Sequence, residues 1–379
     1  MSVESAALPE GGAARPLRIL HIVQHLKNGG AETFVRGLTS GLLARGLDVR
    51  ILSLYPDGLS PSERVALGVP IVSLERRGRA DIAAFYPRLV REIRRARADV
   101  VHAHLHAGKF AGRIGAIVAG APAIVFTEHG DEAGGPLRSA VNRVLHPRTT
   151  RFVVFSEEQR EAFSASERVA LERIVVIRNG VAEPPQADRE RLRAELGLSP
   201  GAFAAYMPAR LTSQKNHSLA LRAFARAFAS DSRARLVFAG AGPLEADIRA
   251  EASALGLGDR TSFLGFRDDA ALLMRAMDAF LMPSLWEKMP LALGEAMRAG
   301  LPVVTSPWAG HTSFVTDDET GIVSADLSVD AFAHAIARMR DPETRRRITA
   351  RARTFAAEAF GLETSVAQHA ALYEQIVRA

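Results

Sequence analysis

The sequence predicts an α/β protein made of two doubly wound domains that face each other across a cleft. Short apolar runs typical of buried strands alternate with amphipathic runs typical of helices, which is the pattern of βαβ units around a parallel sheet. The alternation stops once, at the polar, proline-bearing stretch 182–189, and then starts again. With 379 residues, 47% of them hydrophobic, the chain is long enough to bury two cores.

Strand-like and helical runs follow each other in order along both halves. In the first half, the apolar run 17–23 precedes an amphipathic run at 31–44 and strand-like runs at 49–54, 100–104, 123–127 and 151–155. After the interruption, strand-like runs at 202–207, 235–239, 261–264, 279–282 and 302–305 alternate with helices that start near His217, Leu244 and Leu291. The last run, 363–377, has a helical pattern.

This order divides the chain into three parts. We expect a flexible leader at 1–16, a first domain at 17–182 and a second domain at 183–359, with the C-terminal helix 360–379 packed back on the first domain. Ligands of parallel α/β sheets bind beyond the carboxyl ends of the strands. We therefore expect the functional residues where those ends of the two sheets face each other.

Composition excludes several classes of protein. The chain has no cysteine, so disulfides and thiolate metal sites are impossible, which suits a reducing compartment. Residues 1–16 carry Glu4 and Glu10 and have neither a basic start nor an apolar run, unlike a signal peptide. The most apolar window, 114–126, is too short to span a bilayer and is interrupted by Gly120 and Pro122. We expect a cytoplasmic protein.

Positive charge is concentrated in the first half. Residues 1–184 hold 25 lysines and arginines against 19 acidic residues, while residues 185–379 hold 23 of each. Much of the excess lies in eight arginines: Arg76, Arg77, Arg79, Arg88, Arg91, Arg94, Arg95 and Arg97. Four apolar residues spaced for one helix face accompany them: Ile82, Phe85, Leu89 and Ile93.

Two interpretations of this basic segment stay open. It can dock peripherally on an anionic membrane, which would place the protein on the inner face of the cytoplasmic membrane, or it can be an ordinary solvated helix face. Neither an aromatic platform nor a helix-turn-helix pattern accompanies the arginines, so we expect no nucleic-acid binding.

The segment 285–300 contains two acids eight positions apart, Glu287 and Glu295. It joins a strand to a helix, where free backbone N–H groups favour anions and where carboxylates can accept hydrogen bonds from sugar hydroxyls. A helix-start residue followed by a solvated helix position gives the same spacing. The pair alone does not decide between these two interpretations.

The segment 209–217 places Arg210 and Lys215 between a strand and a helix. Two cations beside a helix N-terminus can neutralise the charge that builds on a departing diphosphate. Ordinary surface placement is the alternative.

The segment KNGGAE, 27–32, follows the first strand and precedes the first helix. Its glycines, Gly29 and Gly30, let the backbone come close to a ligand. The segment lacks the G-x-G-x-x-G spacing, which argues against a dinucleotide-binding dehydrogenase. On its own, it could also be a simple helix-start turn.

Taken in their order along the chain, these three motifs resemble those of the family-4 retaining glycosyltransferases (glycosyl transferases group 1). The resemblance extends from residue 19 to about 373. It implies the GT-B fold, two Rossmann-like domains facing across a cleft. It also implies that Glu287 and Glu295 form a donor-binding E-x7-E signature and that Arg210 and Lys215 clamp the leaving diphosphate. Further donor contacts are implied for Gly265, Phe266, Met289, Pro290 and Leu291. Gly29 and Gly30 are also expected to bind the donor, beside its phosphate, although a place beside the acceptor is the alternative.

Histidines cluster near two strand ends. The resemblance implies that His129, which follows the run 123–127, lies near the donor sugar and joins Arg210, Lys215 and Glu287 as a catalytic residue; a buried structural histidine is the alternative. His102, His104 and His106 alternate as one face of a strand would display them, which makes a zinc site conceivable. The resemblance favours a structural or acceptor-facing role without a metal.

Two residues depart from the family pattern. Lys288 stands where glycine is common after the first acid, and this change could alter the sugar pocket. Ser313 stands where a G-x-x-E pattern places a glutamate, with a smaller expected effect on loop order.

The resemblance implies a retaining, metal-independent glycosyltransferase. Its second domain would bind a nucleoside-diphosphate sugar, and its first domain a glycan, glycolipid or polysaccharide-precursor acceptor. The chain contains no Asp-x-Asp motif, so we expect neither a metal nor another cofactor. The alternatives are a nucleotide-sugar epimerase of the same fold and a catalytically silent sugar-nucleotide-binding protein.

Overall fold

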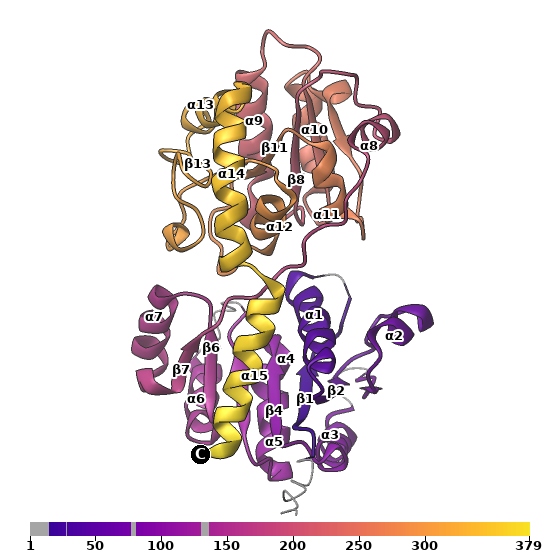
Figure 1. Ribbon diagram of the computed structural model, residues 1–379, viewed down its shortest axis with the longest axis vertical. Helices are drawn as coiled ribbons and strands as arrows, with labels where there is room; N and C mark the ends of the chain where they lie inside the picture. The colour runs from indigo at the N-terminus through magenta and orange to yellow at the C-terminus, as the bar shows by residue number, and fades with distance from the viewer. Residues whose placement is uncertain (1–14, 28, 77–80, 130–135) are drawn as a thin grey trace, which may run out of the picture.

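The computed structural model describes residues 15–27, 29–76, 81–129 and 136–379, which form two α/β units, one above the other in Figure 1. Each unit contains one sheet, and every strand pair of both sheets is parallel. The predicted fold class, two doubly wound α/β domains, is confirmed.

The first sheet has seven strands in the order β3-β2-β1-β4-β5-β6-β7. They are β1 (Arg18–Val23), β2 (Asp48–Ser53), β3 (Ile71–Ser73), β4 (Val100–His104), β5 (Ile124–Thr127), β6 (Arg151–Val154) and β7 (Ile174–Val176). The helices of this unit are α1 (Gly30–Ala44), α2 (Pro61–Leu67), α3 (Ile82–Ala96), α4 (Leu105–Ala107), α5 (Arg113–Ala119), α6 (Pro136–Leu145) and α7 (Glu157–Glu167). The sequence did not predict β3 and β7, which have three residues each and show no clear periodicity.

The second sheet has six strands in the order β10-β9-β8-β11-β12-β13. They are β8 (Ala204–Pro208), β9 (Arg235–Ala239), β10 (Thr261–Phe263), β11 (Ala279–Met282), β12 (Val303–Thr305) and β13 (Ile322–Val323). Its helices are α8 (Arg189–Glu195), α9 (His217–Ala227), α10 (Glu245–Ala254), α11 (Ala270–Leu273), α12 (Leu291–Ala299), α13 (Val329–Arg338) and α14 (Pro342–Ala359).

The chain crosses between the two units twice, at one place. Val181 forms a parallel bridge with Gly361, and its N–H donates to the carbonyl of Phe360 at 2.8 Å. A Cβ on Gly180 would lie 2.4 Å from Cα of Leu362, so only glycine allows this approach. The two crossing segments therefore hold each other between the domains.

The last helix, α15 (Leu362–Arg378), continues from this crossing along the first unit (Figure 1). It packs on α1, where glycines permit close contact: a Cβ on Gly41 would lie 2.5 Å from a methyl of Val366. Tyr373 of α15 is fully buried in the same core. The C-terminal helix is thus an integral part of the first unit.

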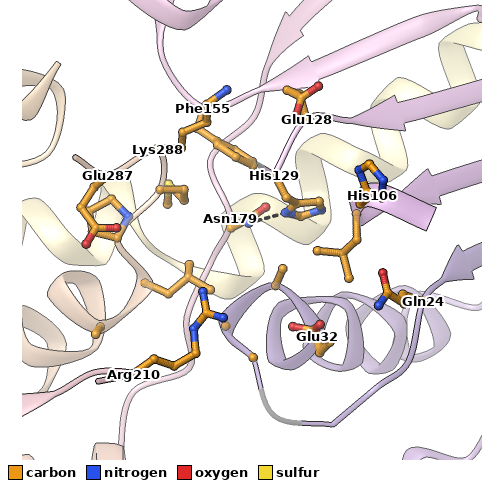
Figure 2. A pocket seen from close by; sticks show the side chains of 18 of the residues that line it. Gln24, Glu32, His106, Glu128, His129, Phe155, Asn179, Arg210, Glu287 and Lys288 are labelled. Atoms are coloured by element: carbon orange, nitrogen blue, oxygen red, sulfur yellow. Dashed lines mark hydrogen bonds between the residues drawn. The ribbon is translucent and has the colours of Figure 1, made fainter. Parts of the chain in front are cut away.

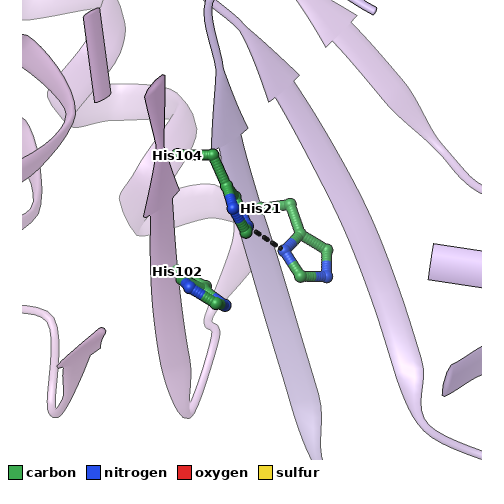
Figure 3. A group of neighbouring side chains, drawn as sticks. All are labelled: His21, His102 and His104. Carbon is green, nitrogen blue, oxygen red and sulfur yellow. Dashed lines mark hydrogen bonds between the residues drawn. The ribbon is translucent and has the colours of Figure 1, made fainter. Parts of the chain in front are cut away.

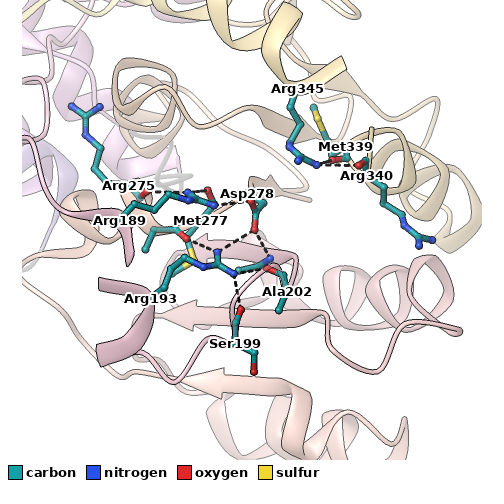
Figure 4. A network of polar contacts seen from close by, with 12 residues as sticks. Arg189, Arg193, Ser199, Ala202, Arg275, Met277, Asp278, Met339, Arg340 and Arg345 are labelled. Atoms are coloured by element: carbon teal, nitrogen blue, oxygen red, sulfur yellow. Dashed lines mark hydrogen bonds and ion pairs between the residues drawn. The ribbon is translucent and has the colours of Figure 1, made fainter. Parts of the chain in front are cut away.

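The polar stretch between the units ends where α8 is anchored to the second sheet (Figure 4). Arg193 is buried and donates to the carbonyls of Ala276 and Ala202, while Arg189 donates to the carboxylate of Asp278 at 2.7 Å. Asp278 also accepts the N–H of Ala204, the first residue of β8. This network fixes where the second domain begins.

The apolar stripe predicted on α3 faces the core, which corrects its interpretation as a lipid-facing surface. Phe85 and Leu89 are fully buried, and Ile93 is nearly so. A Cβ on Gly115 of α5 would lie 2.6 Å from Leu89, so α3 and α5 pack tightly together. The stripe belongs to the core because an amphipathic helix of a doubly wound domain buries its apolar face against the sheet.

The arginines of the basic segment lie mostly on the outer face of α3. Arg91, Arg94, Arg95 and Arg97 are exposed, whereas Arg88 pairs with Asp81 at 2.7 Å. Arg77 and Arg79 fall outside the described residues. No helix in the described part of the chain combines the length and the apolar composition needed to cross a bilayer.

Candidate active site

A cavity of about 920 Å³ lies between the two domains at the carboxyl ends of both sheets. Figure 2 shows side chains of both domains around it. The first domain contributes the loop after β1, the start of α1, α4 and the residues after β5, and the second contributes the loops after β8 and β11. The cavity is therefore placed where parallel α/β sheets bind their ligands.

Lys215 and Glu287 form an ion pair on the second-domain wall of this cavity. Nζ of Lys215 lies 2.5 Å from Oε1 of Glu287, which also accepts the hydroxyl of Ser284 at 2.7 Å. The side chain of Glu287 is 6% exposed and that of Lys215 is 21% exposed. A carboxylate held by a cation inside a polar cavity can exchange that partner for a ligand group.

The loops that carry the two motifs are tied together by their backbones. The N–H of Leu285 donates to the carbonyl of Gln214 at 2.8 Å, and the side chain of Gln214 donates to the carbonyl of Trp286 at 2.9 Å. Arg210 is exposed to the cavity, and no hydrogen bond joins its guanidinium to any residue that the structure describes. Of these two predicted cations, Lys215 is paired with Glu287 and Arg210 is available to an anion.

Three other predicted donor residues, Met289, Pro290 and Leu291, line the cavity beside Lys288. Gly29 and Gly30 line it from the first domain, and a Cβ on Gly30 would lie 3.0 Å from Leu291. The start of α1 therefore lies against the start of α12, across the domain interface.

Glu295, Gly265 and Phe266 are not among the residues that line the cavity. Glu295 lies on α12, whereas Glu287 lies in the loop before this helix, and burial raises the pKa of Glu295 to about 7. Gly265 accepts the N–H of Gly240 at 2.7 Å, and Phe266 is 52% exposed at a strand end. Their roles in donor binding stay predictions.

His129 forms the first-domain wall of the cavity, opposite Glu287 (Figure 2). Its Nδ1 faces the carboxamide nitrogen of Asn179 at 3.5 Å, and its Nε2 lies 3.2 Å from Nδ1 of His104. Burial lowers the pKa of His129 to about 3, so its imidazole is neutral at pH 7.

The three alternating histidines do not form one strand face. β4 ends at His104, and Leu105 has a left-handed φ of 61°, which turns the chain into α4 and directs His106 toward the cavity. His102 and His104 instead meet His21 of β1, which pairs with β4 in register (Figure 3). The expectation of one strand face carrying His102, His104 and His106 is therefore wrong.

The ring nitrogens of His21, His102 and His104 lie within 4.8 Å of one another, a spacing that a metal ion could use. Both nitrogens of His102 are engaged, however: Nδ1 with the hydroxyl of Tyr373 and Nε2 with the hydroxyl of Thr127, each at 2.7 Å. All three rings are fully buried. This set fits a hydrogen-bonded cluster better than a metal site.

Several cavity residues of the first domain were not predicted from the sequence. Lys109 and Glu128 form an ion pair at 2.7 Å with exposed side-chain fractions of 14% and 6%. Asp57 accepts the N–H of Leu59 at 2.9 Å and the hydroxyl of Ser73 at 2.5 Å. Glu128 could have been predicted from the sequence, because it directly follows a predicted strand and adjoins His129.

The two departures from the family pattern both lie at contacts between the domains. The side-chain nitrogen of Gln159 donates to the carbonyl of Lys288 at 2.6 Å. The hydroxyl of Ser313 donates to Glu158 at 2.7 Å, and Arg178 donates to the carbonyl of Ser313 at 3.1 Å. The domains are thus joined directly at the edge of the cavity.

Comparison with known proteins agrees with this geometry. The model of Glycosyltransferase Family 4 matches residues 28–183, and the model of Glycosyl transferases group 1 matches residues 188–355. A relative from Escherichia coli, UDP-Gal:alpha-D-GlcNAc-diphosphoundecaprenol alpha-1,3-galactosyltransferase, is 31% identical over 67% of this chain and 69% of its own. The chain belongs to the family-4 glycosyltransferases. It is therefore a glycosyltransferase with two domains of GT-B type.

Other members of the family align over most of the chain. The D-inositol 3-phosphate glycosyltransferase of Mycobacterium sp. (strain KMS) is 27% identical over 84% of this chain and 80% of its own. Anabaena Alr3699/HepE, solved in complex with UDP and glucose, superimposes with a TM-score of 0.83 at 21% identity, covering 95% of this chain and 100% of that one. The latter similarity shows that this glycosyltransferase shares the fold of HepE.

Proposed function

We propose that this glycosyltransferase moves a sugar from a nucleoside-diphosphate donor, without a metal and with retention of configuration, to a glycan or lipid-linked acceptor. The observation that carries the proposal is that Arg210, Lys215 and Glu287 all line the cavity from the second domain, with Lys215 bonded to Glu287. His129 lines it from the first domain (Figure 2). Cations and a carboxylate side by side suit a ligand that has a diphosphate next to a polyhydroxylated ring.

The donor would bind by exchange of partners. Arg210 and Lys215 would meet the diphosphate, and Glu287, released from Lys215, would accept hydrogen bonds from sugar hydroxyls. Positive side chains then stabilise the charge that develops on the leaving group, which is the contribution a metal makes in other enzymes. The relative from Escherichia coli uses UDP-Gal and HepE was solved with UDP, which supports a uridine diphosphate sugar as donor.

The carboxylates that line the described part of the cavity are each held by a neighbouring basic side chain. Glu32 lies 3.5 Å from His25, and each of the other three has a cationic partner: Asp57 with Arg64, Glu128 with Lys109, and Glu287 with Lys215. In this proposal the acceptor hydroxyl attacks the face that the diphosphate leaves, and a phosphate oxygen receives its proton.

The acceptor would enter along the first domain. The Escherichia coli relative acts on a sugar linked to diphosphoundecaprenol, which supports a lipid-linked acceptor. The exposed arginines Arg91, Arg94, Arg95 and Arg97 could hold the first domain on an anionic membrane by electrostatic attraction alone, since the apolar stripe of α3 is in the core. We place the enzyme in the cytoplasm, peripherally on the inner face of the membrane.

A two-step experiment tests the proposal. A thermal-shift screen across UDP, GDP and TDP sugars identifies the donor, and a transfer assay on diphosphate-linked lipid acceptors follows, with NMR of the product to read the anomeric configuration. We expect the anomeric carbon of the transferred sugar to have the same configuration in the product as in the donor. Inversion would refute retention. Donor binding without transfer to any acceptor would favour the silent binding protein, and an altered free nucleotide sugar would favour the epimerase.

A further inference from the structure

His129 is the outer end of a line of hydrogen-bonded histidines that runs from the cavity into the core of the first domain. Its Nε2 lies 3.2 Å from Nδ1 of His104, and Nε2 of His104 lies 2.9 Å from Nδ1 of His21. His104 and His21 are fully buried on the paired strands β4 and β1 (Figure 3). At the cavity, Nδ1 of His129 faces Asn179.

Each ring of this line carries one proton at neutral pH. Burial lowers the pKa of His129 and of His21 to about 3, and it lowers the pKa of His104 well below its usual value. A neutral imidazole donates from one nitrogen and accepts at the other. The tautomer of each ring therefore dictates the tautomer of the next.

Two arrangements turn both contacts into hydrogen bonds. In the first, Nε2 of His129 donates to His104, Nε2 of His104 donates to His21, and Nδ1 of His129 is an acceptor at the cavity. In the second, every bond runs the other way, and Nδ1 of His129 is a donor. Asn179 can match either one, because its Oδ1 has no partner among the described residues and half a turn of the carboxamide exchanges Oδ1 for Nδ2.

His21, the inner end of the line, has one ring nitrogen without a described partner. Nε2 of His21 is buried without a hydrogen-bond partner in the part of the chain that the structure describes. Such an atom destabilises a fold, and an apolar side chain of the same shape would avoid this loss. The other nitrogen of this ring, Nδ1, lies 2.9 Å from Nε2 of His104, so the ring's contribution to the line is its contact with His104.

We propose that His21 and His104 are positioning residues that decide whether Nδ1 of His129 presents an acceptor or a donor to a hydroxyl of the bound sugar, which would take the place of the long 3.5 Å contact with Asn179. Neither residue lines the cavity, so they act only through His129. The inference rests on the proposed function in one respect, that the sugar lies against His129. The hydroxyl pattern of the sugars that are transferred well would then depend on His104 and His21, which do not touch the sugar.

Histidine tautomers can be measured directly in the full-length protein. Selective labelling with ¹⁵N-histidine and long-range ¹H–¹⁵N correlation spectra distinguish protonated from unprotonated ring nitrogens, and the spectrum of His129→Gln identifies the signals of His129. We expect a single tautomer of His129 in the wild type. In His21→Phe, which removes the inner partner but keeps the ring shape, we expect a mixture of tautomers or the opposite one.

Two variants serve as matched controls. Tyr373→Phe removes a buried hydroxyl that bonds His102, a neighbour outside the line, and should leave His129 unchanged. His21→Asn keeps a hydrogen-bond partner for Nε2 of His104 at the position of Nδ1 and should leave His129 closer to its wild-type tautomer than His21→Phe does. If His21→Phe does not fold, His104→Asn replaces it, because its amide can still meet Nε2 of His129 but cannot reach His21.

Kinetics give a second readout. For His21→Phe, kcat is expected to fall about tenfold while the donor KM stays within about twofold, and His21→Asn should recover most of the loss. The same single tautomer of His129 in the wild type and in His21→Phe would overturn the proposal, as would a mixture in the wild type. The spectra need no transfer activity, so the failure of the proposed function and the failure of this inference can be told apart.

Discussion

Lys215 reaches across the loops of the second domain to place its ammonium group 2.5 Å from Oε1 of Glu287. The residues are separated by 72 positions in the sequence, and backbone bonds between their loops keep them together. Each is the charged partner of the other. The cation proposed to bind the diphosphate and the acid proposed to bind the sugar are therefore coupled, so that occupation of one releases the other.

Lys215→Ala is expected to reduce kcat/KM by a factor of about ten or more. The side chain contributes a charge-assisted hydrogen bond to the diphosphate, and the loss of such a bond costs about 1.5–3 kcal/mol. Initial rates over a range of donor concentrations measure the effect. Near-normal activity would show that the diphosphate binds elsewhere.

A double variant separates this loss from a loss of stability. Among the residues that the structure describes, Lys215→Ala leaves buried Glu287 with Ser284 as its remaining partner. Lys215→Ala with Glu287→Gln removes the unpaired charge of Glu287. We expect urea unfolding to show the double variant as the more stable of the two, while both stay inactive. Recovery of transfer in the double variant would mean that the single change acted only through folding.

Glu295→Gln is expected to abolish transfer and yet stabilise the protein above pH 7. Burial raises the pKa of Glu295 to about 7, above its value in the unfolded chain, so ionisation of Glu295 opposes folding. This penalty is absent below the unfolded pKa and grows as the pH rises from about 4.5 to 7. Glutamine cannot ionise and escapes it.

Urea unfolding at pH 4.5 and pH 8 tests whether ionisation of Glu295 destabilises the fold. The wild type should lose stability relative to Glu295→Gln at the higher pH, and Glu161→Gln, a change of an exposed acid on α7, should follow the wild type. Equal pH dependence of wild type and Glu295→Gln would contradict the shifted pKa. Retained transfer by Glu295→Gln would remove it from the donor site.

The second-domain half of the site could be predicted from sequence because its residues directly follow or precede well-marked strands and helices. Arg210, Lys215 and Glu287 are of this kind, and the structure brings them to one cavity wall. The first-domain half could not be predicted in the same way. Asp57 is held by Ser73 at the end of β3, a strand too short for periodicity, and the turn that directs His106 depends on the left-handed φ of Leu105.

Contacts between segments that are far apart in the chain could not be predicted from the sequence either. His21 meets His104 only because β1 and β4 are neighbours in the sheet, although β2 and β3 lie between them in the chain. Strand order is set by packing of the helices on the sheet, and short sequence windows do not contain it. The apolar stripe of α3 is a second example. Its periodicity predicts that one face of the helix is apolar, but it does not say whether protein or lipid covers that face.

Transfer should be insensitive to EDTA. Arg210 and Lys215 supply the positive charge that the diphosphate requires, so removal of divalent ions leaves the leaving group stabilised. The measurement is the initial rate before and after dialysis against EDTA, with elemental analysis to verify that zinc and manganese are gone. A rate that falls after dialysis and returns with manganese would refute metal independence.

Ser313→Ala is expected to weaken the contact between the domains. It removes the hydroxyl that donates to Glu158 at 2.7 Å but keeps the carbonyl that accepts from Arg178. Because this hydrogen bond is exposed, it contributes about 0.5–1.5 kcal/mol, enough to shift an equilibrium between open and closed domains severalfold. Small-angle scattering should show a larger radius of gyration, and donor affinity should fall.

Ser166→Ala is the control for this experiment. Its hydroxyl donates to the carbonyl of Phe163 within α7, on the same helix as Glu158 but away from the interface. It should leave both the radius and the affinity unchanged. If Ser313→Ala also changes neither, the contact does not hold the domains together.

The last prediction concerns the basic face of α3. Arg91 and Arg95 share one acidic partner, Glu92, and Arg94 donates to two backbone carbonyls, so positive charge is left over on an exposed surface. Each basic residue near an anionic bilayer contributes about 1 kcal/mol, and salt screens the attraction over about 10 Å at 0.1 M. We expect the protein to sediment with vesicles that contain phosphatidylglycerol at low salt and to dissociate as salt rises.

Glutamine at Arg91, Arg94, Arg95 and Arg97 should abolish sedimentation and leave transfer to a soluble acceptor analogue unchanged, because these side chains lie away from the cavity. Arg88 is kept, since it is paired with Asp81.

The matched control removes the same charge from exposed positions of the second domain: Arg226, Arg233, Arg346 and Arg351. If both variants lose binding equally, net charge and not the α3 face drives attachment. If the wild type does not sediment at low salt, the arginines are an ordinary solvated face, because the apolar side of α3 is already buried in the core and cannot insert into lipid.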